Sequence, residues 1–285
     1  MHTTASDGRL SPVDLVARAA AAGLTTISVT DHDTIAALAD VTAAAAAKGI
    51  RVVPGIELTA VDHGRDVHML GYFFDPASAP LATLLHSQRA LRVTRVREIA
   101  NRLAALKMPI DVEGVLLAAA VRPGSSVGRP QVARALVGAG HVPSVQDAFD
   151  RWLATGRPAF VPRAGPTPLE VIQTIHGAGG VASFAHPGVT SRDELIGPLV
   201  DQGLDAIEVY HSDHTAEDIV AYRGLAVRLG VLVSGGSDFH GEDPSKPERI
   251  QRSMLGAITL PAEDLAALER KASASAKGSG ATGSA

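Results

Sequence analysis

The sequence predicts an α/β protein with parallel strands, on the basis of two observations. Short apolar runs rich in β-branched residues alternate with helical runs rich in Ala and Leu, as in proteins with parallel sheets. Polar residues that a buried strand should avoid come directly after several of these runs, where loops at the carboxyl ends of parallel strands converge. With 285 residues, 46% of them hydrophobic and 20% charged, the chain can bury a core without cross-links.

The expected helices and strands follow from local signals along the chain. The first helix spans residues 12–22, with Ser11 as its N-cap, Pro12 at its first position and Gly23 as its end. Further helices are expected at 35–48, 191–202 and 216–229, and strands at 25–30, 50–53, 67–74, 180–185, 206–210 and 231–234.

The middle and the end of the chain differ from this pattern. Residues 86–165 contain consecutive helical patterns without a convincing strand, so we expect a helical insertion that divides the α/β body into residues 1–85 and 166–270. Residues 271–285 are mostly Ala, Gly and Ser with nothing to bury, and we expect a disordered tail.

Composition excludes several functions. The net charge of −4 offers no basic surface for duplex DNA. The absence of cysteine excludes disulfides and thiolate sites, so a transition metal must be held by His, Asp and Glu. No apolar run reaches the roughly 18–20 residues of a membrane span. Asp7 and Asp14 lie within the first twenty residues, where a signal peptide would need an apolar stretch. We therefore expect a cytoplasmic protein without membrane contact.

Candidate ligands for a metal gather at the ends of the expected strands. A single residue of this kind is more often a cap or a loop residue, but five His, two Asp and one Glu share this context. Neutral imidazole and carboxylate groups suit Zn²⁺, Mn²⁺ or Fe²⁺, which predicts a metal site. The eight residues are His2, Asp7, His32, Glu57, His68, His186, Asp238 and His240.

Six ordered motifs resemble those of the PHP (polymerase and histidinol phosphatase) family. The resemblance extends to about residue 270. Within the family the chain is similar to bacterial phosphoesterases that act on nucleoside 3′,5′-bisphosphates and on the 5′ ends of short RNAs, with Arg129-Pro130 and Phe160-Val161-Pro162 as further matches. The six motifs are His2 to Gly8, Thr30-Asp31-His32-Asp33-Thr34, Pro54-Gly55-Ile56-Glu57, His68 to Tyr72, Ala185-His186-Pro187 and Gly236-Ser237-Asp238-Phe239-His240.

This resemblance implies a distorted (β/α)7 TIM-like barrel with a trinuclear metal centre. A hydroxide shared by the first two metals would be the nucleophile. By the same resemblance, His2, Glu57 and Asp238 would hold the first metal, Glu57, His68 and His186 the second, and Asp7, His32 and His240 the third.

Residues beyond the ligands are expected to contact substrate. Arg129 resembles a phosphate-binding element, and Arg134 follows it in the insertion. His211 and His214 come just after a strand and are candidates to orient substrate or to protonate a leaving oxygen. For His214, surface capping is nearly as good an interpretation. Catalysis is assigned to Glu57, Asp238 and His211.

The chain departs from the family pattern at two places. Family members begin Asp-Leu-His-x-His, and Met1 stands at the x position, so one metal ligand and the first strand are absent from the chain as given. We expect a start codon assigned too late or a truncation. Gln131 stands where the branch often has His, and its amide can donate a hydrogen bond but cannot carry charge.

The favoured function is removal of the 3′-phosphate from a nucleoside 3′,5′-bisphosphate, with 5′-to-3′ trimming of short oligoribonucleotides as an additional activity. The expected cofactors are two or three divalent ions, Mn²⁺, Zn²⁺ or Fe²⁺. A histidinol-phosphate phosphatase and a non-catalytic PHP module are the alternatives. The sequence gives no indication of the oligomeric state.

Overall fold

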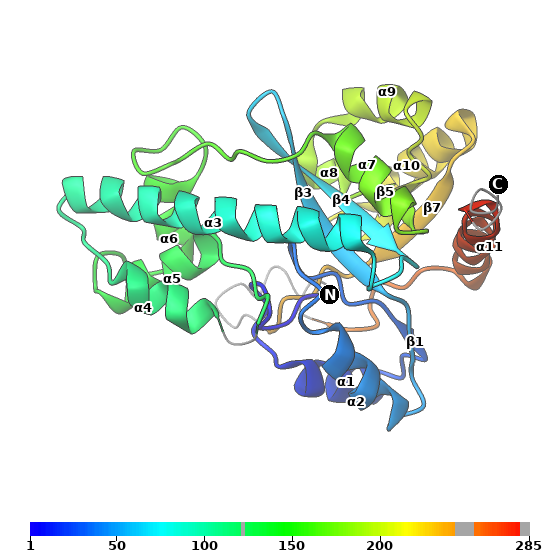
Figure 1. Cartoon of the computed structure of the whole chain (residues 1–285), viewed down its shortest axis with the longest axis horizontal. Helices are drawn as coiled ribbons and strands as arrows, with labels where there is room; N and C mark the ends of the chain where they lie inside the picture. Colours follow the sequence, from blue (N-terminus) through cyan, green and yellow to red (C-terminus); the bar gives the residue numbers. More distant parts are fainter. Residues whose placement is uncertain (121–122, 243–253, 280–285) are drawn as a thin grey trace.

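The strands of the protein form one large and one small sheet (Figure 1). The computed structural model describes residues 1–120, 123–242 and 254–279. The small sheet pairs β1 (Thr26–Ile27) with β2 (Arg51–Val52) in parallel. The large sheet has the order β3-β4-β5-β6-β7, with β3 Gly55–Asp62, β4 Arg65–Tyr72, β5 Val181–Phe184, β6 Ala206–His211 and β7 Leu232–Gly236. The chain therefore has an α/β fold with a mixed sheet.

Strand β3 corrects the prediction of an all-parallel sheet. It runs antiparallel to β4, which runs antiparallel to β5, whereas β5, β6 and β7 are parallel. The two residues between β3 and β4, His63 and Gly64, both have positive φ, as a tight hairpin requires. The sequence predicted no strand at residues 55–62, and β3 follows β2 after only two residues, with no helix between them.

The strands do not close into a barrel through the hydrogen bonds of the described residues. The two sheets are linked by an isolated bridge between His32 and Glu57, where Asp33 N–H donates to the Glu57 carbonyl at 2.9 Å. Strand β1 pairs over only two residues. The predicted distorted seven-stranded barrel is therefore not confirmed as a closed set of strands, and the bridge that links the two sheets carries two candidate metal ligands.

The helices follow the predicted caps with several differences. The N-cap Ser11 accepts a hydrogen bond from Asp14 N–H, and Gly230 ends α10 with a φ of 69°. A 3-10 turn and the short α9 replace the helix predicted at 191–202, and α7 and α8 were not predicted. The helices are α1 Pro12–Ala21, α2 Leu38–Ala46, α3 Ala79–Ala105, α4 Val112–Ala119, α5 Arg129–Gly138, α6 Val145–Ala148, α7 Pro168–Gly177, α8 Pro187–Thr190, α9 Ile196–Asp201, α10 Ala216–Leu229 and α11 Ala262–Ser279, with a π-helical turn at Phe149–Leu153 and a 3-10 turn at Asp193–Leu195.

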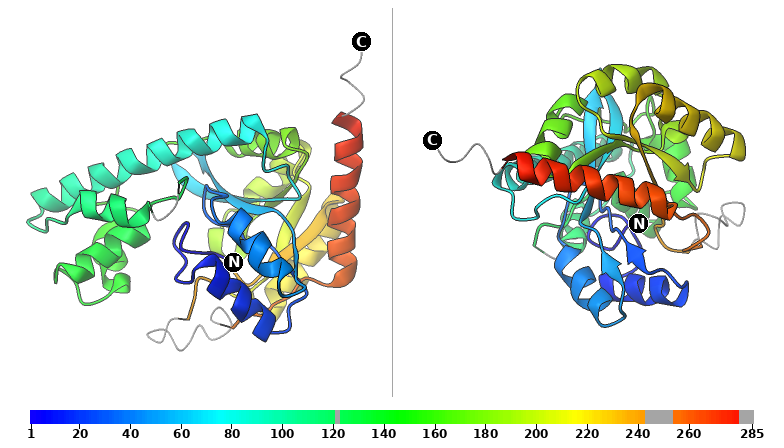
Figure 2. Two further views of the ribbon diagram at one scale, coloured as in Figure 1. Left: turned by 60° about the horizontal axis from the view of Figure 1, so that its bottom comes forward. Right: turned by 90° about the vertical axis from the view of Figure 1, so that its right-hand side faces the viewer.

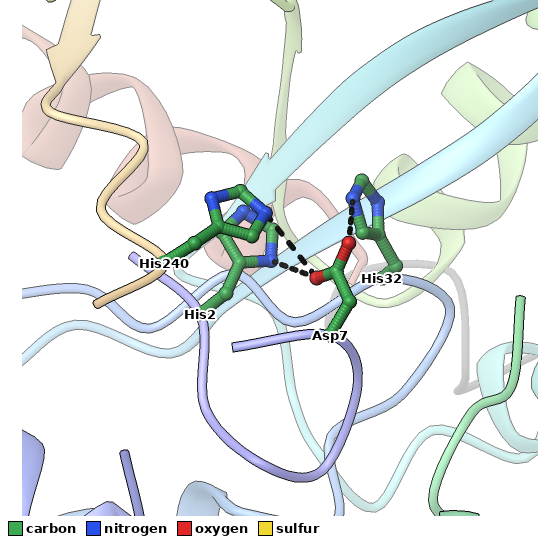
Figure 3. Close-up of side chains that lie close together, drawn as sticks. All are labelled: His2, Asp7, His32 and His240. Carbon is green, nitrogen blue, oxygen red and sulfur yellow. Dashed lines mark ion pairs between the residues drawn. The ribbon is translucent and has the colours of Figure 1, made fainter. Parts of the chain in front are cut away.

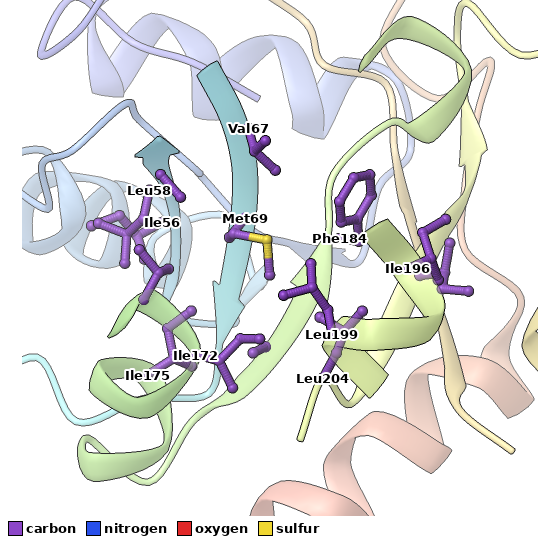
Figure 4. Close-up of a cluster of buried hydrophobic side chains, with 14 of the residues drawn as sticks. Ile56, Leu58, Val67, Met69, Ile172, Ile175, Phe184, Ile196, Leu199 and Leu204 are labelled. Atoms are coloured by element: carbon purple, nitrogen blue, oxygen red, sulfur yellow. The ribbon is translucent and has the colours of Figure 1, made fainter. Parts of the chain in front are cut away.

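Separate apolar clusters stabilise the sheet and the helical insertion. One face of β3 and β4 packs under α7, where Leu58, Met69 and Phe184 are fully buried (Figure 4). A second cluster lies among α3 to α6 and includes Leu103 and Leu136. Helix α3 has 27 residues and runs from the sheet into the helical lobe (Figures 1 and 2). This long helix fixes the lobe relative to the sheet.

The predicted tail is helical as far as Ser279. Leu268 and Ala272 of α11 are buried against Val181 and Ala206, and the Lys271 ammonium lies 2.9 Å from the Asp205 carboxylate. Figure 2 shows α11 on the side of the molecule opposite the helical lobe. Residues 271–279 are therefore helical and not disordered, with Ala272 packed on the sheet, and residues 280–285 lie outside the described part.

None of the described helices is long and apolar enough to span a membrane.

Candidate metal centre

The N-terminal segment lies beside the ends of two strands. Thr30 N–H donates to the Met1 carbonyl, and His2 N–H donates to the Phe239 carbonyl, both at 2.8 Å. Asp31, which is almost completely buried, accepts hydrogen bonds from Thr3 N–H at 2.7 Å and from the Thr3 and Ser6 hydroxyls at 2.6 Å. These bonds shape the loop that carries His2 and Asp7 to the mouth of the site.

Glu57 projects from β3 into the middle of this cluster. Alternation along the strand places Ile56 and Leu58 in the core and Glu57 on the opposite face. The Glu57 Oε1 atom lies 2.5 Å from His68 Nδ1 and 3.2 Å from His186 Nε2. The Oε2 atom lies 3.2 Å from His2 Nε2 and 3.5 Å from His32 Nδ1. Each carboxylate oxygen thus faces a different pair of imidazoles.

Two further ligand candidates occupy strained backbone positions at strand ends. His186, just after β5, has a φ of 28°, and Asp238, just after β7, has a φ of 48°. Non-glycine residues rarely adopt positive φ, and where they do the residue is often functional. The strain turns both side chains back toward the mouth, where Asp238 Oδ1 lies 2.9 Å from His2 Nε2.

Three overlapping groups of ligand atoms result. The first joins His2, Glu57 and Asp238, the second His32, Glu57 and His68, and within each the ligand atoms lie within 4.8 Å of one another. In the third group the Asp7 carboxylate faces His2 at 3.7 Å, His32 at 3.8 Å and His240 at 3.2 Å (Figure 3). All eight residues that the sequence singled out are therefore brought together, His186 through its contact with Glu57.

The electrostatics of the site favour the anionic forms of Glu57 and Asp7 and the neutral form of His32. Burial opposes ionisation of Glu57, but the charges of His32 and His68 more than offset it and hold the pKa of Glu57 well below its usual range. Burial likewise raises the pKa of Asp7, and His240 and His32 outweigh it, so this pKa is also well below normal. Burial lowers the pKa of His32 to about 3. Metal ligation requires these protonation states.

The side chain of His2 tests whether this site fits a metal. It is 1% exposed, and neither ring nitrogen forms a hydrogen bond of normal geometry with a protein group. A buried imidazole normally has such a partner. His2 is instead surrounded by the carboxylates of Asp7, Glu57 and Asp238. A divalent cation among these groups satisfies both the nitrogen lone pair and the carboxylate charges, so the residues fit one.

The two histidines after β6 have different surroundings. His211 Nδ1 accepts a hydrogen bond from Asp213 N–H, which places the proton of the neutral ring on Nε2, 3.7 Å from Asp238 Oδ2. His214 Nδ1 donates to the Val209 carbonyl at 2.8 Å, and its Nε2 accepts from Gly188 N–H at 3.2 Å. Both nitrogens of His214 are engaged by backbone, which does not favour the predicted contact with substrate.

The two predicted substrate arginines lie in the insertion. Arg129, at the start of α5, is partly buried, and its guanidinium lies 3.5 Å from Asp66. Arg134 lies on α5, close enough to Asp7 for that carboxylate to act on the electrostatics of its guanidinium. The Gln131 amide donates to the Ser6 carbonyl at 2.6 Å and thereby ties α5 to the loop that carries Asp7.

The sequence reasoning missed a buried ion pair next to the site. Asp33 is completely buried and has a φ of 51°. It accepts hydrogen bonds from Arg92 Nε at 2.6 Å, Arg163 Nη1 at 3.2 Å and Thr59 N–H at 2.8 Å. Burial raises the pKa of Asp33, but Arg92 and Arg163 outweigh it and lower that pKa. The position of Asp33 directly after His32 was the available signal, whereas both arginines are distant in sequence.

Comparisons with known proteins agree with this geometry. The family model described as PHP domain matches residues 1–154. A Haemophilus influenzae protein named 5′-3′ exoribonuclease is 37% identical over 84% of this chain and 88% of its own length. A Chromobacterium violaceum protein named 3′,5′-nucleoside bisphosphate phosphatase is 34% identical over 84% of this chain and 85% of its own length.

A solved structure from Bifidobacterium adolescentis gives the same result for the fold. It is described as a candidate metal-dependent phosphoesterase and matches this chain with a TM-score of 0.84 and 32% identity, covering 95% of this chain and 94% of that one.

Proposed function

Because the chain belongs to the PHP domain family and is a metal-dependent phosphoesterase, we propose that it removes the 3′-phosphate from nucleoside 3′,5′-bisphosphates. A relative of 34% identity is named for this activity. Phosphate esters of this kind carry charges that a cluster of cations can neutralise during in-line displacement.

The observation that carries the proposal is the position of Glu57 between two groups of imidazoles. Its Oε1 faces His68 and His186, and its Oε2 faces His2 and His32. A buried carboxylate placed in this way can join two adjacent cations.

We assign the ligands of two or three divalent ions, Mn²⁺, Zn²⁺ or Fe²⁺, to these groups. When bound, the ions supply Lewis acidity and an activated water. His2, Glu57 and Asp238 hold the first, Glu57, His68 and His186 the second, and Asp7, His32 and His240 the third. His2 and His32 each belong to two of the observed groups, so the three sites share a single pocket.

We assign His211 the role of general acid, which donates the proton on its Nε2 atom to the leaving oxygen. Its Nδ1 accepts from backbone, so Nε2 is the nitrogen that can donate. Asp238 Oδ2 lies 3.7 Å from that atom and orients the ring. His214 is assigned a positioning role, because it holds the Gly188 backbone two residues after His186.

We assign Arg129 and Arg134 the role of binding a substrate phosphate. Both lie in the insertion, on one side of the site. Arg129 lies at the amino end of α5, where backbone N–H groups also favour anions. We further propose that the two sheets correspond to an opened form of the seven-stranded family barrel.

A second activity, 5′-to-3′ trimming of short oligoribonucleotides, is favoured by the relatives named 5′-3′ exoribonuclease, which are 33–37% identical. A short RNA would present its terminal phosphodiester to the same groups.

Phosphate release by the Mn²⁺-loaded full chain tests the proposal. We expect adenosine 3′,5′-bisphosphate to be hydrolysed with a kcat/KM at least about tenfold above that of histidinol phosphate. A 5′-phosphorylated tetraribonucleotide measures the second activity. Faster hydrolysis of histidinol phosphate would support the histidinol-phosphatase alternative, and no hydrolysis of any substrate would support a non-catalytic PHP module.

A further inference from the structure

We propose that a cluster of arginines beside the metal centre is a second anion subsite, which binds the phosphate of a nucleoside bisphosphate that is not hydrolysed. The inference rests on the proposed function and deepens it by assigning the second phosphate to named residues. The arginine cluster consists of Arg92, Arg95, Arg129 and Arg163, gathered around Asp33 and Asp66.

The arginine cluster carries more positive than negative charge. Four guanidinium groups face two carboxylates, which leaves a surplus of two positive charges. Burial and the neighbouring Arg92 lower the pKa of Arg163 to about 9, as expected where like charges crowd together. A phosphate monoester carries a charge of about −1.5 to −2 at pH 7. One such phosphate therefore balances the cluster.

The carboxylates of Asp33 and Asp66 contact the arginines at different distances. Asp33 forms short contacts with Arg92, 2.6 Å to Nε and 2.5 Å to Nη2. Asp66 Oδ2 lies 3.5 Å from Arg129 Nη2, 3.6 Å from Arg163 Nε and 4.0 Å from Arg95 Nη1. These last distances exceed those of hydrogen bonds between N–H and oxygen. Asp66 therefore offsets charge without satisfying the guanidinium donors.

Two of these donors are buried without a hydrogen-bond partner. The side chains of Arg95 and Arg163 are 7% and 9% exposed, and the Nη2 atom of Arg95 and the Nε atom of Arg163 donate to no protein acceptor. Buried polar groups in proteins are nearly always satisfied, so unused donors of this kind indicate a missing acceptor. Phosphate oxygens accept hydrogen bonds from several guanidinium groups at once.

Other contacts hold the arginines in place. Two of them lie over the ring of Phe160, whose centroid is 5.7 Å from the Arg129 guanidinium carbon and 5.8 Å from that of Arg95. Arg95 Nε donates to the Val161 carbonyl at 2.8 Å. The guanidinium groups are thus positioned before any anion binds, which reduces the entropy lost on binding.

The position of the cluster suits a ligand that also reaches the metal centre. Asp66 and His68 are two residues apart on the same face of β4, which corresponds to about 7 Å along a strand. His68 lies 2.5 Å from Glu57 Oε1. The separation is similar to that of two phosphates attached to the 3′ and 5′ oxygens of one ribose. Asp66, 23% exposed, occupies the place of the second phosphate when no ligand is bound.

Calorimetric titration of the full chain in EDTA tests the subsite without hydrolysis. Adenosine 5′-monophosphate is the probe, and adenosine measures any contribution of the base and sugar. We expect the wild type to bind the monophosphate at least about tenfold more tightly than adenosine, and Arg163→Gln and Arg129→Gln each to weaken that binding at least about tenfold. The exposed Arg97→Gln is the matched control, with wild-type affinity.

Asp66→Asn separates the proposal from a purely structural role of the cluster. Removal of a carboxylate that competes with phosphate should strengthen monophosphate binding at least about threefold, whereas loss of a merely structural ion pair should weaken it or leave it unchanged. This variant and Arg129→Gln decide the matter if Arg163→Gln does not fold.

Kinetics with the Mn²⁺-loaded enzyme distinguish failure of the subsite from failure of the proposed function. We expect Arg163→Gln to lower the ratio of kcat/KM for adenosine 3′,5′-bisphosphate to that for adenosine 3′-monophosphate at least about tenfold. An unchanged ratio, together with unchanged monophosphate binding, overturns the subsite even if the bisphosphate is hydrolysed. Absence of bisphosphate hydrolysis by the wild type overturns the proposed function, whereas the calorimetric result still decides the subsite.

Discussion

Replacement of Glu57 by Gln should remove the connection between two of the three ligand groups. Glu57 belongs to the group with His2 and Asp238 and to the group with His32 and His68, so the substitution leaves each with two of its three ligands. The amide nitrogen of Gln cannot ligate a cation, and only one oxygen remains. The change in volume is negligible, so the effect reports ligation and not packing.

The magnitude follows from the number of ligands lost. Changes to groups that merely support metal ligands cost about 10- to 100-fold in metal affinity, so loss of a direct ligand in two groups should cost at least about 100-fold in each. Loss of charge neutralisation in the transition state should lower kcat by at least about 10³-fold, or roughly 4 kcal/mol.

A chelator-competition titration with Mn²⁺ measures the affinity, and phosphate release from adenosine 3′,5′-bisphosphate measures kcat. Glu208→Gln is the matched control, because Glu208 is also buried and faces the same region, where it accepts a hydrogen bond from His186 N–H at 2.8 Å. We expect the control to lose no more than about tenfold in metal affinity, the lower end of the range for groups that support metal ligands. Wild-type metal affinity and kcat in Glu57→Gln would refute the reasoning.

Three further predictions concern the substrate, the buried ion pairs and pH. Arg129→Ala should raise KM at least about tenfold with a smaller change in kcat, measured by steady-state phosphate release, and an effect confined to kcat would contradict this assignment. Asp33→Asn should lower the free energy of unfolding by about 3–5 kcal/mol in urea titrations, because two buried guanidinium groups lose their counter-ion, and a loss below about 1 kcal/mol would show that the pairing is unimportant. Burial raises the pKa of Asp205, but hydrogen bonds from His176, from the backbone and from Lys271 outweigh it and lower this pKa below its usual 3.8. The resulting stabilisation is complete above that value and is lost as the pH falls through the folded pKa, so stability measured between pH 6 and pH 3 should decline below about pH 4, and less steeply in Asp205→Asn.

Local signals in the sequence predicted the helices with clear caps. The Ser11-Pro12 start of α1 and the Gly230 end of α10 lie where the sequence placed them. The signals failed where packing decides the structure. Strand β3 follows β2 without a helix between them, and the alanine-rich end of α11 is helical because Ala272 packs against the sheet.

Several candidate ligands could be predicted because they follow strand ends, where polar residues are conspicuous, whereas Glu57 and His68 lie within β3 and β4. His186 directly follows an apolar run, Asp238 comes shortly after the end of β7, and both are at the site. Of the arginines around Asp33 and Asp66, Arg129 was predicted through its resemblance to a phosphate-binding element, whereas Arg92 and Arg163 were not. Arg92 and Arg163 are charged residues in helical or loop segments, and their burial depends on how the insertion packs against β3 and β4.

The most direct test of the central claim is an anomalous diffraction experiment at the manganese absorption edge on crystals of the Mn²⁺-loaded full chain. We expect at least two peaks, with Glu57 oxygens about 2.0–2.3 Å from two different ions and with His2, His68 or His186 as further ligands. Peaks confined to other parts of the surface, or a single ion that does not contact Glu57, would contradict the account.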